Sequence, residues 1–244
     1  MTKNLIKKII FVVIILLVIA ASIYIMYRYS IEGEKEMPFS LERVLIVSTV
    51  DGKVNDDPNN IWNIGVTQVN DIFIYINKTT DENRTIKDIK FQNFEIKKKP
   101  KMGKVSLLLP TDDMPRLYDN SQEDYMGKEF SYVGGKIDNL KDQEIANTGG
   151  VLGFRFSLNN LGNFVSSENE EVIYDGRLLS NLGLTIEDIA FSVGFDIIIT
   201  TDKNVNYQSK MYLDLPIETV IEEGSSNKSI TNFDGMVFKR VTTD

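Results

Sequence analysis

The sequence predicts an all-β domain, an antiparallel β-sandwich of jelly-roll or immunoglobulin-like type, behind one N-terminal transmembrane helix. Two observations predict this fold. Three lysines near the N-terminus precede an unbroken apolar run, Ile9–Tyr27. After residue 38, apolar side chains mostly recur at every second position, which is the period of a β-strand.

The apolar run has the length of a membrane span. Its 19 residues form a helix of about 28 Å at 1.5 Å per residue, close to the ~30 Å hydrocarbon core of a bilayer. We therefore divide the chain into a tail (1–8), a transmembrane helix (9–28), a linker (29–38) and a domain (39–244). The side chains expected to face lipid include Ile9, Phe11, Ile15, Leu16, Ile19, Ile23 and Tyr27.

The charges beside the span predict its direction. Lys3, Lys7 and Lys8 precede it, whereas Arg28 and several acidic residues follow it. Lysine excess stays cytoplasmic, so we expect the domain outside the cytoplasmic membrane. The alternative is a cleaved signal peptide with its small-residue site at Ala20–Ser22. The apolar run continues for five residues beyond that site, which favours an uncleaved anchor.

The composition excludes several kinds of chemistry. Beyond residue 29 the chain has 23 basic and 35 acidic residues, a formal charge of −12, which argues against a nucleic-acid partner. The absence of Cys and His removes disulfides, thiolate or imidazole metal sites, and catalytic units that use His as a base. The high content of Lys, Asn and Ile is typical of a low-GC bacterium.

The clearest strand pattern predicts a hairpin. Ile189–Thr201 and Tyr207–Leu215 both alternate, and a polar loop (202–206) joins them. Other segments with strand character are Arg43–Val50, Ile61–Val66, Ile72–Asn77, Ile86–Ile96, Val105–Leu109, Phe130–Val133, Val151–Leu158, Val172–Tyr174 and Met236–Val241.

Three local features refine this pattern. The inward phase switches between Phe91 and Phe94, which predicts a β-bulge. The segment 68–71 is either a turn or the polar middle of one bent strand. Asp175–Gly183 is the best helix candidate, one or two turns long, with an N-cap and a glycine stop.

About eleven short strands favour one large sandwich. The alternative is two immunoglobulin-like halves that divide near 112–124. No convincing internal repeat supports the second reading.

The chain resembles uncharacterised single-pass membrane-anchored proteins of low-GC Gram-positive bacteria. The resemblance covers most of the chain and rests on the Lys/Asn/Ile-rich anchor and on two segments, Asn70–Lys78 and Ile189–Thr201. Because those proteins have no assigned activity, the resemblance implies a location and no site residues.

Two acidic loops are the candidates for a metal. Calcium takes six to eight oxygen ligands, often from loop carboxylates. Neither loop has the spacing of an EF-hand, and a solvated loop of good turn formers is the alternative. Calcium apart, we expect no cofactor. The candidate ligands are Asp51, Asp56, Asp57, Asp112, Asp113, Asp119, Glu123 and Asp124.

Two further features are candidates for binding. Lys97–Lys101 with Lys104 is the one basic cluster; it suits wall teichoic acid, anionic lipid or an acidic partner, or it is a solvent-facing turn. Trp62 alternates with inward residues and is expected in the core. The tyrosines expected at the surface are Tyr118, Tyr125 and Tyr132.

No catalytic motif is found, so we expect a non-enzymatic module that binds or scaffolds a cell-envelope protein or polymer. An edge strand or the loops 51–60 and 112–127 are expected to form the contact. One alternative is a cell-wall-active hydrolase with paired carboxylates. Another is an accessory subunit of a membrane complex, which predicts an apolar patch on the domain.

Overall fold

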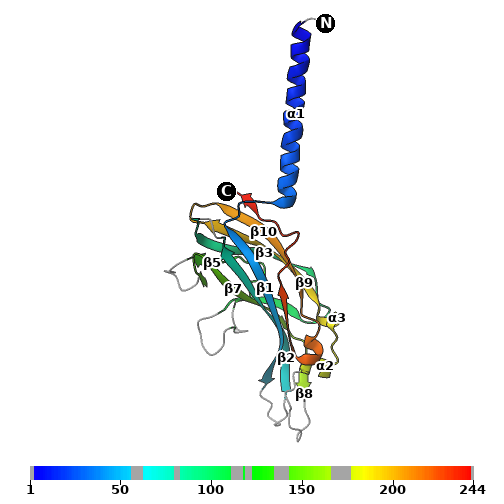
Figure 1. Ribbon diagram of the computed structural model, residues 1–244. Helices are drawn as coiled ribbons and strands as arrows, with labels where there is room; N and C mark the ends of the chain where they lie inside the picture. Colours follow the sequence, from blue (N-terminus) through cyan, green and yellow to red (C-terminus); the bar gives the residue numbers. More distant parts are fainter. Residues whose placement is uncertain are drawn as a thin grey trace.

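The computed structural model describes residues 3–55, 63–79, 83–110, 118, 123–134, 143–165 and 177–242. The chain is mostly β, in two six-stranded sheets, with one N-terminal apolar helix, α1 (Lys3–Glu32) (Figure 1). Figure 1 shows α1 projecting from one end of the β domain, beside the C-terminus. We call this the helix-proximal end and the opposite one the distal end.

The two sheets have simple orders, and all described strand pairs are antiparallel except β5–β6. The first sheet, sheet A, runs β11 (Ser225–Ile230), β1 (Phe39–Asn55), β2 (Asn63–Lys78), β7 (Gly149–Asn159), β4 (Lys104–Leu108), with β8 (Asn163–Val165) also on β2. The second, sheet B, runs β12 (Lys239–Val241), β10 (Asn206–Leu215), β9 (Phe191–Thr201), β3 (Ile86–Lys98), β5 (Phe130–Gly134), β6 (Gln143–Ile145). The short helices are α2 (Leu178–Asn181), α3 (Ile186–Ile189) and α4 (Val220–Glu223).

The apolar faces of the two sheets share one core. Phe154 on β7 is fully buried, with ring centroids 5.3 Å from Phe91 on β3, 5.8 Å from Phe130 on β5 and 5.7 Å from Phe195 on β9. These edge-to-face contacts join sheet A to three strands of sheet B. Residues on both sides of 112–124 belong to the same core cluster.

Several strand predictions are confirmed. The predicted hairpin is β9–β10, although its first two residues belong to α3 and its cap. The two segments around 68–71 form one strand, β2, so the polar stretch is a strand interior and not a turn. The predicted bulge lies in β3, where the register shifts between Gln92 and Glu95 and Asn93 has φ 57°.

Other predictions are wrong or lie outside the described residues. The strand predicted from Met236 begins only at Lys239, because the Met236 N–H donates to the Phe233 carbonyl in a turn at Gly235 (φ 89°). The strand 172–174, the N-cap Asp175 and Trp62 lie outside the described residues. α1 is longer than the predicted span at both ends, since its polar ends stay helical.

A polar network inside sheet A fixes the corner that follows β10. Ser48, Gln68 and Asn70 are fully buried, and the Ser48 hydroxyl donates to Asn70 Oδ1 (2.7 Å). The side-chain amides of Gln68 and Asn70 bond to each other (2.8 and 2.9 Å). The Ile217 N–H donates to Ser48 Oγ (3.0 Å). Each polar side chain thereby gains a partner, which removes the cost of burying it.

The junction between α1 and the β domain is held by the C-terminal strand. Gly33 ends the helix at φ 69°, and a Cβ there would lie 2.6 Å from the Phe238 carbonyl oxygen. The Glu34 N–H donates to that same oxygen (2.7 Å), and the Arg240 N–H donates to the Tyr29 hydroxyl (2.8 Å). Arg240 Nε also lies 2.7 Å from Glu34 Oε2. α1 therefore enters the domain through a short, bonded connection.

Candidate functional site

The sheet edges differ in how they are covered. At the β4 edge of sheet A, the Leu107 N–H donates to Asp124 Oδ1 (2.9 Å) and the Leu107 carbonyl accepts from Tyr125 N (2.9 Å). The β11 edge presents mostly polar side chains and Lys228, which discourage pairing with a further strand. These two edges are therefore poor templates for an added strand.

The β10 edge of sheet B is open along most of its length. β12 pairs with β10 only at Asn206–Gln208. From Ser209 to Leu215, the described part of the chain places no strand beside β10 on the side away from β9. An edge of this kind exposes N–H and C=O groups that can pair with another chain.

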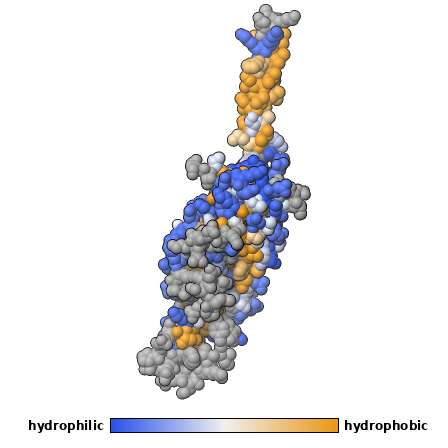
Figure 2. Space-filling model, turned by 90° about the vertical axis from the view of Figure 1, so that its left-hand side faces the viewer, coloured by the Kyte–Doolittle hydropathy of each residue, from blue (hydrophilic) through white to orange (hydrophobic). Residues whose placement is uncertain are grey.

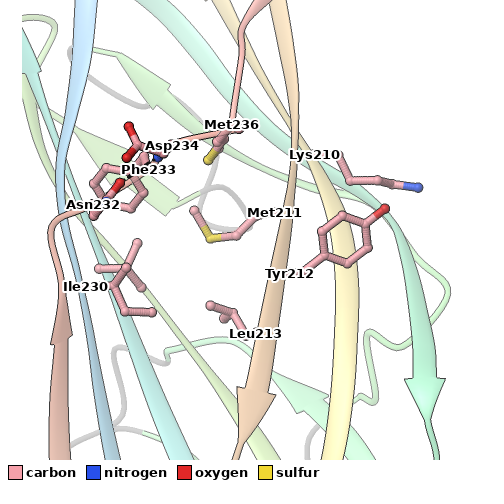
Figure 3. Close-up of a pocket in the computed structure, with 11 residues that line it drawn as sticks. Lys210, Met211, Tyr212, Leu213, Ile230, Asn232, Phe233, Asp234 and Met236 are labelled. Atoms are coloured by element: carbon pink, nitrogen blue, oxygen red, sulfur yellow. Dashed lines mark hydrogen bonds between the residues drawn. The ribbon is translucent and has the colours of Figure 1, made fainter. Parts of the chain in front are cut away.

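An apolar groove of about 300 Å³ runs along this open edge (Figure 3). One wall is β10, and the other is Ile230 with the segment 231–238 that crosses from β11 to β12. Figure 3 shows Met211 and Leu213 pointing into the groove, while Tyr212 points away from it. The apolar lining residues are Val44, Met211, Leu213, Ile230, Phe233 and Met236. Lys210, Asn232 and Asp234 also line it.

The local sequence explains both walls. In β10, Met211, Leu213 and Leu215 are at most 4% exposed, while the residues between them face solvent, as strand alternation requires. The crossing segment is held in a turn, in which the Asp234 N–H donates to Asn232 Oδ1 (2.7 Å). This turn and the one at Gly235 place Phe233 and Met236 over the groove.

The outer face of sheet B beside the groove is a paired polar surface. The nearly buried Asp196 accepts from Asn93 Nδ2 (2.8 Å) and Gln208 Nε2 (3.1 Å). Lys210 Nζ lies 3.1 Å from Glu95 and 4.0 Å from Asp196. The hydrogen bond that the Lys210 ammonium donates to Glu95 raises the pKa of Lys210, so this group stays charged through the physiological range. Asp196 and Glu95 therefore stabilise the outer face of sheet B, and neither carboxylate faces a cleft.

Three of the eight predicted calcium ligands, Asp51, Glu123 and Asp124, lie among the described residues. Asp51 is exposed on β1, and no group of three or more carboxylates that could hold a metal occurs among the described residues. Glu123 pairs with Lys128, and Asp124 accepts from the backbone of Leu107 and Met126. Asp124 thus covers a strand edge, a role that its sequence context does not signal. The other candidates, Asp56, Asp57, Asp112, Asp113 and Asp119, lie outside the described residues.

The remaining residues that the sequence predicts for binding are the basic cluster and the tyrosines. The basic cluster lies at the β3–β4 turn, away from α1, where Lys97 pairs with Glu95 (2.6 Å) and Lys101 with Glu187 (3.4 Å). The surface prediction for two tyrosines is wrong: Tyr118 and Tyr132 are 8% and 3% exposed. Burial raises the pKa of Tyr132, whose hydroxyl donates to the Gly153 carbonyl.

α1 is the one described helix long and apolar enough to cross a membrane. Figure 2 shows an almost continuous apolar surface along it, beside a mostly hydrophilic end of the β domain. The side chains expected to face lipid are 42% to 65% exposed, so the rest of the protein does not cover them. Such a surface is stable only in an apolar environment.

Comparison with known proteins identifies no similar protein. The chain matches no protein-family model, no curated protein and no solved structure. Function is therefore inferred from α1, the open β10 edge and the groove beside it.

Proposed function

We propose that this chain is a single-pass protein of the cytoplasmic membrane whose extracytoplasmic β domain, a non-enzymatic module, binds an extended segment of a partner protein. The observation that carries the proposal is the open edge of β10 from Ser209 to Leu215, which lies along an apolar groove. α1 is the anchor, with the N-terminus in the cytoplasm.

The anchor is supported by length, exposure and charge. Lys7 and Lys8 precede the apolar surface, and Arg28 follows it. Tyr24, Tyr27 and Tyr29 suit the outer headgroup region, where an aromatic ring sits half in water. Anchoring also confines the groove near the membrane and raises its effective concentration for partners there. A protein with this function can act as an accessory subunit of a membrane complex.

Strand addition is the binding mode that the edge favours. β12 is antiparallel to β10 at Asn206–Gln208, so this edge already accepts one strand. A partner strand that continues along Ser209–Leu215 gains main-chain hydrogen bonds, which supply affinity. Alternate side chains of that strand then point into the groove, between Met211 and Ile230.

The lining of the groove indicates the chemistry of the partner. The walls of the groove are aliphatic, methionine and phenylalanine side chains, which suit a partner strand with apolar side chains at alternate positions. Methionine side chains also adapt to ligands of irregular shape. Anionic wall polymers are disfavoured by Asp234 at the groove and by the acidic domain. A carboxylate hydrolase needs two facing acids, whereas Asp234 is the one acid among the described lining residues. The groove therefore favours a protein segment.

Site-specific crosslinking in cells tests this function. The chain has no cysteine, so Asn232→Cys, exposed at the groove, carries the only thiol for a photoactivated crosslinker. Ser180→Cys, exposed on α2 at the distal end, is the matched control. We expect a partner peptide attached at Asn232→Cys and absent at Ser180→Cys, mapped by mass spectrometry to an extended, alternating segment. The same products from both positions, or no product at Asn232→Cys, would contradict the proposal.

A further inference from the structure

The helix-proximal end of the β domain must lie close to the bilayer surface, if α1 is the anchor proposed above. The apolar sequence of α1 ends at Tyr27, and the helix continues only to Glu32. At 1.5 Å per residue this exposed turn spans roughly 8 Å. That length is about one Debye length at physiological ionic strength, so charges at this end interact with headgroups.

The connection does not let the domain turn freely. Besides the Glu34 and Arg240 bonds to the junction, the linker is tied to the end of β2. The Thr79 N–H donates to the Pro38 carbonyl (2.9 Å), and the Thr79 hydroxyl donates to the Met37 carbonyl (3.2 Å). One defined face of the domain is therefore turned toward α1 and toward the membrane that α1 crosses.

The described residues of this face are mostly basic, in a chain of net charge −8. We define it by the linker 33–38, the strand ends 78–79, 83–87 and 239–242, and the hairpin loop 202–205. Within these described ranges, seven residues are basic: Lys35, Lys78, Arg84, Lys87, Lys203, Lys239 and Arg240. Three residues of the same ranges are acidic: Glu34, Glu36 and Asp202.

Its positive charge is only partly neutralised within the protein. Lys78, Lys203 and Lys239 have no ion pair with any residue that the structure describes. Lys87 donates to the neutral amide oxygen of Asn204 (2.9 Å) and has no carboxylate partner among the residues that the structure describes. Among the acids, Glu34 is already paired with Arg240.

We propose that this face binds the headgroups of anionic phospholipids in the bilayer that anchors the protein. Lysines near a membrane surface are attracted to anionic lipid, and the acidic remainder of the domain is repelled by it. The two effects together hold the domain upright on α1. β10 runs from this end toward the distal end, so the groove beside it then stays open to partners from the side.

The chain contains its own control for this inference. The turn 97–104 carries a comparable number of lysines at the other end of sheet B, where β3 and β4 meet. Lys98 and Lys99 are both exposed there. Reversing their charges changes the net charge of the protein as much as reversing Lys203 and Lys239, without touching the helix-proximal face.

The test uses the full-length protein in vesicles that contain a lipid with a nitroxide-labelled headgroup. A fluorophore on Asn83→Cys reports on the helix-proximal face, and one on Ser180→Cys reports on the distal end. When phosphatidylglycerol replaces 30% of the phosphatidylcholine, we expect quenching at Asn83→Cys to rise at least about twofold over phosphatidylcholine alone. Half-molar salt or the pair Lys203→Glu and Lys239→Glu should reverse the rise, and Lys98→Glu with Lys99→Glu should not.

The possible failures are distinguishable. Flotation with phosphatidylcholine vesicles reports on the anchor alone. A protein that does not float overturns the anchor and this inference together. If the protein floats, two results overturn this inference and leave the proposed function intact. In the first, phosphatidylglycerol does not change the quenching. In the second, both charge-reversal pairs change the quenching equally.

Discussion

Phe154→Ala is expected to lower the free energy of unfolding by about 3–5 kcal/mol, the range for truncating a buried phenylalanine. The ring is fully buried and contacts rings from β3, β5 and β9 of the other sheet. Its loss leaves a cavity between the sheets, and the surrounding rings belong to strands that cannot all move inward. The two sheets would therefore lose their central contact.

Guanidinium chloride titration of the detergent-solubilised full-length protein, followed by near-UV circular dichroism, measures this change. Phe164→Ala is the control, because this phenylalanine is only half-buried on β8, and it should cost clearly less. If Phe154→Ala does not fold, Phe154→Leu should still lower the transition midpoint. A loss below about 1 kcal/mol for Phe154→Ala would show that the sheets do not share this core.

Ile230→Lys is expected to reduce crosslinking from Asn232→Cys at least about tenfold, which corresponds to about 1.4 kcal/mol of binding free energy. Ile230 is half-buried and faces Met211 and Leu213 across the groove. A lysine stem can lie along that wall with its ammonium at the groove mouth, so the domain remains folded. An apolar partner side chain would have to bury that charge, which is costly.

Val165→Lys is the matched control, because it adds the same charge to an exposed strand valine far from the groove. It should leave crosslinking unchanged. Thermal unfolding of each variant separates a blocked groove from a damaged fold, and Met236→Lys, which changes the opposite wall, should repeat the loss. Equal crosslinking from Ile230→Lys and the unchanged chain would count against the groove.

The sequence was sufficient to predict the elements whose own residues determine their structure. Apolar residues recur at every second position through most of β9 and β10, and a short polar loop joins the two strands, so the hairpin could be predicted from the period. The bulge in β3 was also predictable, because a phase switch in one strand leaves a trace in the sequence. α1 combines length with apolar composition, which few other elements do.

Other elements depend on partners that are distant in the sequence. β11, with the sequence SSNKSI, has no apolar alternation and becomes a strand because Val44–Thr49 of β1 pairs with it. The groove forms because the chain crosses from β11 to β12 past an open edge, and no local pattern marks that crossing. The sequence likewise shows Asp124 only as an acidic loop residue, whereas in the fold its carboxylate accepts a hydrogen bond from the Leu107 N–H at the edge of β4.

Hydrogen exchange of the full-length protein, with and without a synthetic peptide that copies the segment crosslinked at Asn232→Cys, tests the central claim most directly. Strand addition predicts that the amides of Ser209–Leu215 that do not bond to β9 exchange at least about tenfold more slowly with the peptide. The amides of the β11 edge should be unaffected. If the peptide binds but leaves Ser209–Leu215 unchanged and protects another part of the domain, the β10 edge is not the binding site.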